Sequence, residues 1–523
     1  MKRYSRFART AAPIAALTLM LAACTSDEGE EGTSSEPTTS SSGESTGAAT
    51  SGQVAGSVLT VNWGGFPENW TPGAEMEAGF MRVPYENLVV KDAAGTIQPY
   101  LVTAWEQDDS SLTLTLRDDV TFHDGTPFNA EAVKVNIETV QNTPGPYAGT
   151  FSSVTSIDVD DEYMVTLNLS EPTPSLLTAM ATRALPIASP TAIADGSIAT
   201  TPVGTGPWMY DEAASVTGTR MSFGPNADYW GDLPGFETIQ LVAIDDDTAA
   251  SAALANGEID VTDTEANQLS TLDSAGNISH LAYPALRNNP MFFDRGPGGM
   301  FEDVEVRQAF CYALDTVTLS EIETDWKPMS QHFVEGESGY NADIVGYEND
   351  VAMAQELYDG AGNPPVDAEM MSTVFNTTQM QLYADQVSEI GMTVSVTEAP
   401  PPQYFSEWNS GAYPLGLGSN DEQTAYDWYK AWFAADAPGN PSGVESDALK
   451  AAADAAIAAG TSAEADALWG EVTKVISDEA LTCAHVAGDE LVAWNDDTVS
   501  GAAAPTETWE TNLINYRDLR PVE

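Results

Sequence analysis

The chain has 523 residues, more than one hydrophobic core usually organises, so we expect two or more domains. Its 79 acidic and 19 basic side chains give a formal net charge of -60. Nucleic-acid binding needs a basic surface, and anionic lipid repels negative charge, so this balance argues against both as partners of the folded domains. Attraction of cationic ligands is one reading of the charge, but a solvated acidic surface is the interpretation we favour.

The chain begins with the features of an export signal. A basic stretch contains Lys2, Arg3, Arg6 and Arg9. The apolar run from Pro13 to Ala23 is too short to span a bilayer and fits a signal peptide. It ends in Leu21-Ala22-Ala23-Cys24, which resembles the lipobox of bacterial lipoproteins. We therefore predict a signal peptide over residues 1–23 and a lipid at Cys24. Ordinary secretory cleavage, with Cys24 incidental, is the alternative.

A tether follows the predicted lipidation site. Residues 24–57 are rich in Ser, Thr, Gly and Glu and contain few apolar side chains, so they cannot bury enough surface to fold. No later segment of the sequence is apolar enough to cross a bilayer. The sequence thus predicts a domain held at the outer face of a membrane through its lipid.

The first folded elements are predicted strands and a helix. Val58 to Val61 reads as a strand, and Leu112 to Leu116 alternates apolar and threonine residues, as a half-buried strand does. Asn129 is suited to cap a helix in which Val133, Ile137 and Val140 are spaced to form an apolar face. The segment from Ile157 to Leu169 is predicted to form a hairpin.

His123 and Asp124 lie side by side before a glycine, which raises the question of catalysis. The sequence contains no Gly-x-Ser-x-Gly motif to supply a nucleophile. The remaining histidines, His280, His332 and His485, lack the spacing of a metal site. We interpret His123 and Asp124 as part of a turn, and we predict no catalytic residues, metal or cofactor.

Helices and strands alternate through the rest of the chain. Asp245 to Asp247 is predicted to start a helix over 248–255, and Asp303 another. Strands at 371–375 and 392–396 flank a helix over 379–390, and two more helices are expected at 448–459 and 463–476. This alternation predicts an α/β fold. Cys311 and Cys483 could form a disulfide in an exported protein, or remain two buried thiols.

Several motifs in this order resemble one family. The most specific is the region from Tyr85-Glu86-Asn87-Leu88-Val89 through Phe122-His123-Asp124-Gly125-Thr126-Pro127-Phe128. Further matching motifs are Pro202 to Pro207, Asn226 to Trp230, Gly257 to Asp260, and Val306 to Ala309. The chain resembles the extracytoplasmic solute-binding proteins of ABC importers, family 5, a class that includes dipeptide-, oligopeptide- and nickel-binding proteins.

The resemblance implies a two-lobed periplasmic-binding-protein fold (type II, cluster C) with an extra inserted domain. Lobe one is expected to comprise residues 58–88, 195–284 and 487–523. The inserted accessory domain is expected at 89–194, and lobe two at 285–486. The family binds its ligand between the lobes, which close by hinge motion.

The resemblance also implies where a ligand would bind. Peptide-binding members use an acidic residue after a lobe-two strand to pair with the ligand's ammonium group, and Asp421 is the best match here. The family's usual tryptophan is absent, and its usual aspartate after Tyr413 is Pro414, so a helix-capping role for Asp421 is the alternative. Further candidates for ligand contacts are Asn62, Trp63, Tyr404, Trp408 and His485.

These features predict a membrane-anchored, monomeric solute-binding protein that delivers di- or oligopeptides to an ABC permease. Oligosaccharides and nickel or other metal chelates are alternative ligands in the same role. A secreted hydrolase and a lipoprotein that senses a solute without importing it are alternatives of a different class.

Overall fold

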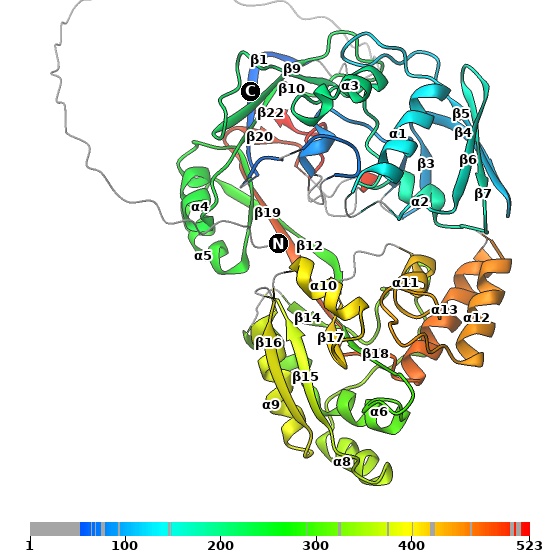
Figure 1. The fold of residues 1–523 in the computed structure, drawn as a ribbon. Helices are drawn as coiled ribbons and strands as arrows, with labels where there is room; N and C mark the ends of the chain where they lie inside the picture. The colour runs from blue at the N-terminus through cyan, green and yellow to red at the C-terminus, as the bar shows by residue number, and fades with distance from the viewer. Residues whose placement is uncertain are drawn as a thin grey trace, which may run out of the picture. The chain divides into compact units, whose positions relative to one another are not determined.

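The computed structural model describes residues 53–522, except 64, 68, 75–78, 93–94, 145–146, 148, 289, 323–325, 374–375, 400, 419–423, 461–462, 503–506 and 509–513. All of these described residues belong to one compact unit, Gly52–Glu523 (Figure 1). The predicted signal peptide, Cys24 and most of the predicted tether lie outside the described residues. The last residues assigned to the predicted tether belong to the first strand, which begins at Val54 rather than Val58.

Lobe one is built on a mixed sheet that has eight strands within the described part of the chain. The strand order is β12-β19-β11-β1-β10-β9-β8, and β14 pairs with β19 outside this path. The strands are β1 (Val54–Asn62), β8 (Trp208–Tyr210), β9 (Arg220–Pro225), β10 (Phe236–Val242), β11 (Val261–Thr264), β12 (Ile278–Asn288), β14 (Trp326–Pro328) and β19 (Val486–Asn495). β1 runs parallel to β10 and β11, and the remaining pairs are antiparallel.

Short helices accompany this sheet. They are η1 (Gly79–Arg82), α3 (Pro190–Asp195), η2 (Ser197–Ala199), α4 (Asp247–Ala255) and α5 (Ala266–Ala275). Asp246 caps α4 by accepting a hydrogen bond from the Ala249 amide at 2.8 Å, so the acidic run predicted to start this helix does so. The lobe-one core includes Leu59, Val61, Trp70, Trp208 and Phe223.

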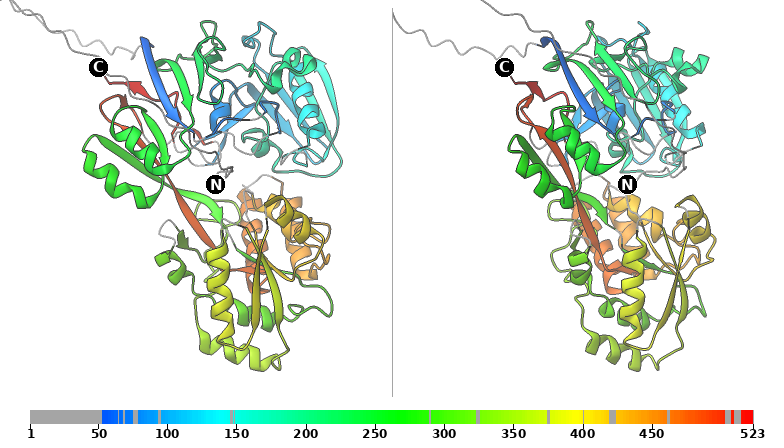
Figure 2. Two further views of the ribbon diagram at one scale, coloured as in Figure 1. Left: turned by 60° about the vertical axis from the view of Figure 1, so that its left-hand side comes forward. Right: turned by 90° about the vertical axis from the view of Figure 1, so that its left-hand side faces the viewer.

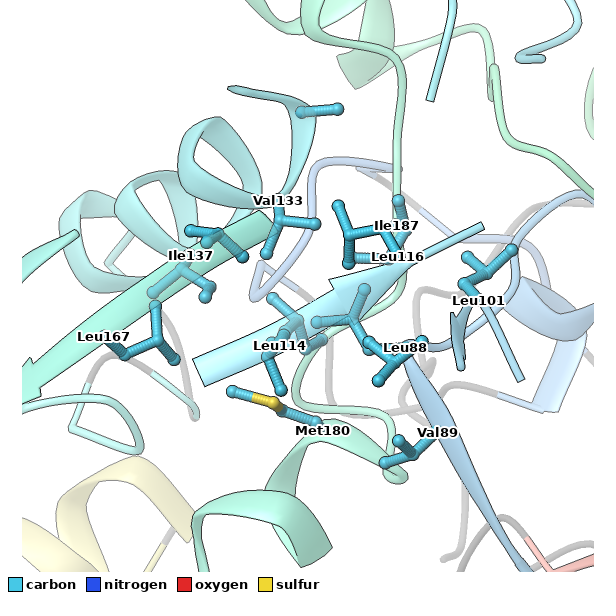
Figure 3. Close-up of a cluster of buried hydrophobic side chains, with 14 of the residues drawn as sticks. Leu88, Val89, Leu101, Leu114, Leu116, Val133, Ile137, Leu167, Met180 and Ile187 are labelled. Atoms are coloured by element: carbon cyan, nitrogen blue, oxygen red, sulfur yellow. The ribbon is translucent and has the colours of Figure 1, made fainter. Parts of the chain in front are cut away.

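The accessory domain is an antiparallel sheet of order β4-β5-β7-β6 covered by two helices. Its elements are β4 (Val102–Gln107), β5 (Ser111–Leu116), α1 (Ala130–Asn142), β6 (Val154–Asp161), β7 (Met164–Leu169) and α2 (Leu176–Met180). Leu114 and Leu116 on β5 pack with Val133 and Ile137 of α1 (Figure 3). The predicted alternation, hairpin and amphipathic helix are therefore present, and the Asn129 side chain caps α1 as expected.

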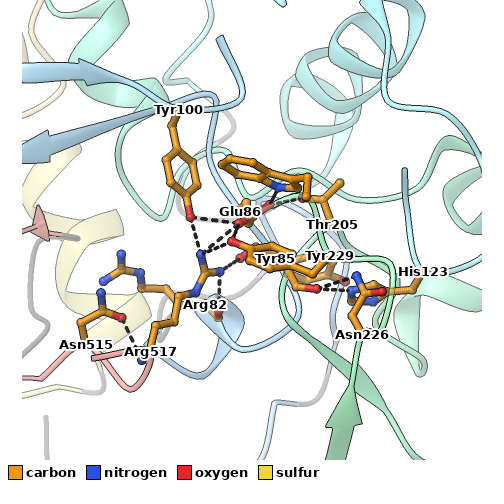
Figure 4. A network of polar contacts seen from close by, with 12 residues as sticks. Arg82, Tyr85, Glu86, Tyr100, His123, Thr205, Asn226, Tyr229, Asn515 and Arg517 are labelled. Carbon is orange, nitrogen blue, oxygen red and sulfur yellow. Dashed lines mark hydrogen bonds and ion pairs between the residues drawn. The ribbon is translucent and has the colours of Figure 1, made fainter. Parts of the chain in front are cut away.

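A buried polar network joins the accessory domain to lobe one. The Glu86 side chain is fully buried and lies 2.9 Å from Arg517 Nη1 (Figure 4). Four neutral side chains donate further hydrogen bonds to its carboxylate at 2.8–2.9 Å: Tyr100, Thr205, Tyr229 and Trp230. The carboxylate is thus saturated by donors from distant parts of the chain, as a buried charge requires.

Two small sheets complete this half of the molecule. One has the order β21-β2-β3, and the other pairs β20 with β22. Their strands are β2 (Val89–Asp92), β3 (Ile97–Pro99), β20 (Val499–Ser500), β21 (Glu507–Thr508) and β22 (Arg520–Pro521). The chain leaves the accessory domain at residues 187 and 188. Ile187 packs in the hydrophobic core of the accessory domain, whereas Ala188 packs in the core of lobe one. This switch precedes the boundary expected after residue 194.

Lobe two contains a second sheet, of order β16-β15-β17-β13-β18. Its strands are β13 (Met291–Phe293), β15 (Asp367–Ser372), β16 (Thr393–Glu398), β17 (Leu415–Leu417) and β18 (Thr482–Cys483). Its helices are α6 (Val304–Ala313), α7 (Thr316–Ile322), α8 (Val351–Gly360), α9 (Thr377–Ser388), α10 (Pro401–Asn409), α11 (Ala425–Trp432), α12 (Asp447–Ala458) and α13 (Ala463–Asp478). β15, α9 and β16 form the predicted β-α-β unit, with the two strands parallel.

A disulfide and a pair of long strands organise lobe two and its connection to lobe one. Cys311 on α6 is bonded to Cys483 on β18, with their Cα atoms 5.8 Å apart. β12 and β19 run antiparallel to each other from the lobe-one sheet toward lobe two (Figure 2). β14, which follows α7 of lobe two, pairs with the first residues of β19. The chain therefore passes between the lobes along paired strands.

Candidate functional site

The ligand loop predicted from the sequence lies between β17 and α11. Asp421 itself, with residues 419–423, lies outside the described residues, so its role stays a prediction. The elements on both sides of it are described. Leu415 and Leu417 are buried on β17, and Thr424 caps α11 by accepting a hydrogen bond from the Asp427 amide at 3.1 Å. The loop thus starts and ends on ordered elements of lobe two.

The helix after this loop contacts the accessory domain. Ser175, just before α2, donates a hydrogen bond through Oγ to Asp427 Oδ1 at 2.7 Å. The Tyr426 hydroxyl donates to the Pro172 carbonyl at 3.3 Å. Lys430 Nζ lies 3.6 Å from Glu171 Oε2. We call these three contacts the α11 bridge, because they connect lobe two to the accessory domain.

Asp427 is the most buried acid of the α11 bridge. Desolvation by burial raises its pKa, while hydrogen bonds from Thr424 and Ser175 act in the opposite direction. Thr424 donates to Asp427 Oδ2 at 2.6 Å, so both carboxylate oxygens accept a hydroxyl group. One of the two hydroxyl donors of this carboxylate therefore comes from the accessory domain.

Aromatic and imidazole rings pack beneath α11. The ring of His332 stacks on Trp428, with centroids 4.4 Å apart and planes 9° from parallel. His485, directly before β19, lies with its ring 6.4 Å from each of these two rings. Burial lowers the pKa of His485 to about 3, so this imidazole is neutral at physiological pH. His485 thus lies directly before the strand that leads back to the lobe-one sheet, and its predicted ligand contact stays a prediction.

Asn62 and Trp63 lie at the end of β1, as the sequence predicted, but Asn62 has a structural role. Its amide group donates to the Ile244 carbonyl and to Thr262 Oγ1, at 3.2 and 3.0 Å, and its Oδ1 accepts from the Ile244 amide at 2.8 Å. These bonds use the amide to join β1 to its neighbours, so the structure does not support Asn62 as a ligand contact. Trp63 is half-buried, with its ring edge-on to Phe80 at 5.8 Å.

Tyr404 and Trp408 are also structural rather than ligand-facing. Their exposed fractions are 3% and 1%. The Tyr404 hydroxyl donates to the Leu417 carbonyl, and Trp408 Nε1 donates to the Gly439 carbonyl at 3.1 Å. Their spacing of four residues on α10 places both on one face, which is the sequence signal for core packing that our interpretation passed over.

His123 and Asp124 hold a turn in place, as predicted. Gly204 N–H donates to His123 Nδ1 at 3.3 Å, so the other ring nitrogen carries the proton and donates to the Gly206 carbonyl at 2.9 Å. Asp124 accepts a hydrogen bond from Ser189 Oγ at 2.5 Å. The turn thereby fastens the accessory domain to the segment from Pro202 to Pro207.

Two features are absent from the part of the chain that the structure describes. No three His, Cys, Asp or Glu side chains there gather as ligands of a metal would. No helix there has the length and apolarity needed to cross a membrane.

Sequence comparison shows which known proteins this chain resembles. Residues 96–440 match the family described as bacterial extracellular solute-binding proteins, family 5 Middle. The chain is 24% identical over 401 residues to the probable D,D-dipeptide-binding periplasmic protein DdpA of Escherichia coli, covering 73% of this chain and 77% of that protein. A shorter match to the nickel-binding periplasmic protein of Escherichia coli is 32% identical over 186 residues, which is 34% of this chain and 35% of that protein.

Solved structures show the same fold. NikA from Brucella suis in complex with Fe(III)-EDTA has a TM-score of 0.76 and 22% identity, covering 89% of this chain and 100% of that chain. DppA from Helicobacter pylori in complex with peptide STSA has a TM-score of 0.70 and 20% identity, covering 89% and 98%. The predicted two-lobed α/β binding-protein fold is therefore confirmed.

Proposed function

This chain belongs to family 5 of the bacterial extracellular solute-binding proteins, and we propose that it captures di- or oligopeptides and delivers them to the permease of an ABC importer. The relatives are substrate-binding proteins of ABC transporters rather than enzymes, so we propose a binding role and no catalytic activity. The choice of peptide as the ligand, and the anchoring described below, are our proposals.

One observation carries the proposal of an interlobe ligand site. The predicted ligand loop leads directly into α11, and α11 makes the α11 bridge to the accessory domain. A ligand held by this loop would therefore lie next to the contacts that connect the two halves of the molecule. Such a placement couples ligand capture to closure of the lobes.

The chemistry proposed for the loop is pairing of a carboxylate with an ammonium group. Asp421 would accept charge-assisted hydrogen bonds from the N-terminus of a peptide. Two further side chains, Trp63 and His485, stay candidates for contacts to the rest of the ligand. A neutral His485 would offer a hydrogen bond without competing with the peptide's ammonium for Asp421.

The names of two relatives support a peptide ligand. One is a probable D,D-dipeptide-binding protein, and another, from Brucella ovis, is a putative ABC transporter peptide-binding protein that is 27% identical over 396 residues. The match to a nickel-binding protein favours a metal chelate as the second candidate ligand.

We propose that the mature protein is anchored to the outer face of the membrane through a lipid on Cys24. The lipobox-like sequence and the Ser- and Thr-rich tether support this location, and the family places the domain outside the cytoplasm. A single copy of the chain would serve one permease.

Calorimetric titration with paired peptides tests the proposed function. The compact unit Gly52–Glu523 is titrated with short peptides that have a free N-terminus and with the same peptides after N-acetylation. We expect binding of the free peptides and a loss of at least tenfold in affinity after acetylation, because the ammonium is removed. No binding of free peptides, together with binding of a nickel chelate, would favour the second candidate.

A further inference from the structure

Two buried arginines of lobe two meet at one cavity. Arg295 follows β13, and Arg307 lies on α6. Their exposed fractions are 4% and 6%. Burying a guanidinium is costly unless an anion compensates its charge, so a buried arginine is normally paired with a carboxylate.

Each nitrogen of the Arg307 guanidinium donates a hydrogen bond, and every acceptor is a backbone carbonyl. Its Nη1 donates to the carbonyls of Phe301 and Glu302, both at 2.8 Å. Its Nη2 donates to the Glu479 carbonyl at 2.7 Å, and its Nε is shared between the carbonyls of Glu479 and Ala480. Backbone oxygens orient this guanidinium, and the Glu479 carboxylate favours its charged form without forming an ion pair with it.

The Arg295 guanidinium makes fewer and longer hydrogen bonds than the Arg307 guanidinium. Its Nη1 and Nη2 donate to the carbonyls of Phe293 and Val444, each at 3.3 Å, and its Nε is buried without a hydrogen-bond partner. Among the described residues, neither Arg295 nor Arg307 forms an ion pair with a carboxylate. Carboxylates act on them only from beyond ion-pair distance: Asp294 and Glu479 on Arg295, and Glu479 and Asp303 on Arg307.

Both arginines line a cavity of about 170 Å³. The other lining residues are Pro297, Glu302, Val444, Ser446, Glu479 and Leu481. Ser446 is the N-cap of α12, so the positive end of a twelve-residue helix also meets the cavity. A volume of this size holds several water molecules or one small oxyanion.

Two carboxylates belong to the same lining. Glu302 is exposed and accepts a hydrogen bond from the Gly298 amide at 2.6 Å, and half-buried Glu479 accepts one from Ser446 Oγ at 2.7 Å. Both are engaged with other donors and are more open to water than the guanidiniums. Burial and then repulsion by Arg307 lower the pKa of Arg295 to about 10, while the Asp294 and Glu479 carboxylates act to raise it, so Arg295 is positively charged at neutral pH. The buried part of the lining thus presents two guanidiniums.

We propose that this cavity binds a small oxyanion, such as phosphate or sulfate, which accepts hydrogen bonds from Arg295. A planar guanidinium with free N–H groups matches two oxygens of such an anion. The anion would supply the acceptor that Nε lacks and would offset the repulsion between the two arginines.

The proposed anion site is separate from the predicted ligand loop. β13 and β17 are antiparallel, with Met291 opposite Leu417 and Phe293 opposite Leu415. β17 leads into the ligand loop from Leu417, whereas β13 leads toward Arg295 from Phe293. Arg295 thus follows the end of the strand pair opposite to the end from which the chain enters the predicted ligand loop, and the proposed anion is therefore distinct from the proposed peptide ligand.

Thermal unfolding of Gly52–Glu523 tests the proposal without a peptide ligand. Melting temperatures are compared in sodium phosphate and in sodium chloride at equal ionic strength. Phosphate also stabilises proteins non-specifically, so Arg295→Gln is compared with Lys450→Gln, which removes an exposed cation. We expect phosphate to add on the order of 2 °C in the wild-type and Lys450→Gln proteins and less than half of that in Arg295→Gln.

An equal phosphate increment in all three proteins, or none in the wild type, would overturn the proposal. If Arg295→Gln does not fold, anomalous diffraction from wild-type crystals soaked in selenate replaces it. A selenium peak within hydrogen-bonding distance of Arg295 Nε supports the site, and an empty cavity at saturating selenate contradicts it.

Discussion

Ser175 donates a hydrogen bond to Asp427 at 2.7 Å although 252 residues separate them in the chain. Ser175 belongs to the accessory domain and Asp427 to the helix that follows the predicted ligand loop. Asp427 is half-buried and accepts hydrogen bonds from the hydroxyls of Ser175 and Thr424, so separating the two segments would remove one of its two hydroxyl donors.

Replacing Ser175 with alanine should weaken ligand binding. Closure of the lobes on a ligand requires these segments to be together, so losing the bond disfavours the ligand-bound state. We expect affinity to fall by about 0.5–1.5 kcal/mol, the net value of one hydrogen bond, in calorimetry.

Ser170→Ala is the matched control for this substitution. Ser170 Oγ donates to the Ser153 carbonyl inside the accessory domain, so its loss should leave the affinity unchanged. Equal affinities of the wild-type and Ser175→Ala proteins would show that the α11 bridge does not contribute to binding.

His485 should make the domain less stable in mild acid. Its folded pKa of about 3 lies below the unfolded value of about 6.5, so protons bind the unfolded state first as the pH falls. Its contribution is complete above the unfolded pKa and is lost progressively as the pH falls toward 3. By pH 5 the loss is about 2 kcal/mol.

Urea unfolding of the wild-type and His485→Gln proteins at pH 7.5 and 5 measures this effect, because glutamine cannot be protonated. The stability difference between the two pH values should be smaller in His485→Gln. A pH dependence that is identical in the two proteins contradicts a neutral, buried His485.

The disulfide between Cys311 and Cys483 should stabilise lobe two. It closes a loop with a sequence separation of 172 residues, which restricts the unfolded chain. Reduction should lower the free energy of unfolding by about 2–5 kcal/mol, measured by urea titration with and without reductant. The Cys311→Ala/Cys483→Ala protein should be insensitive to reductant, and a wild-type protein equally insensitive would mean that the thiols are unpaired.

Asp421→Asn tests the proposed ammonium contact. If Asp421 binds the N-terminus of a peptide, the substitution should cost about 1.5–3 kcal/mol of binding free energy. Glu422→Gln removes the same charge from the neighbouring position and serves as the control. Unchanged affinity in calorimetry would exclude Asp421 from this role.

Cys24→Ser tests the proposed anchor. Without a lipidated cysteine, the chain should be recovered from the growth medium or the soluble extracytoplasmic fraction rather than from membranes. Fractionation and immunoblotting measure the distribution. A variant that stays with the membrane would show that another feature holds it there.

Local signals were sufficient to predict much of the fold. The cap at Asn129, the alternation in β5 and the acidic start of α4 each arise from neighbouring residues, and the structure contains all three. The long strand β12 was not anticipated, because Pro284 interrupts its pattern and its pairing partner β19 is far along the chain.

The candidate site was harder to predict because its contacts are not local. Asn62 was correctly placed at a strand end, but its partners near Ile244 and Thr262 have no signature in the sequence around it. Tyr404 and Trp408 were interpreted as ligand contacts from their proximity to the ligand loop, whereas burial on one helix face determines their role. The Ser175–Asp427 bond has no sequence signal at all.

The most direct test of the peptide proposal is mass spectrometry of small molecules released when Gly52–Glu523, purified from its own host, is denatured. We predict a mixture of short peptides with free N-termini. A single non-peptide species, such as an oligosaccharide or a metal chelate, would contradict the proposal.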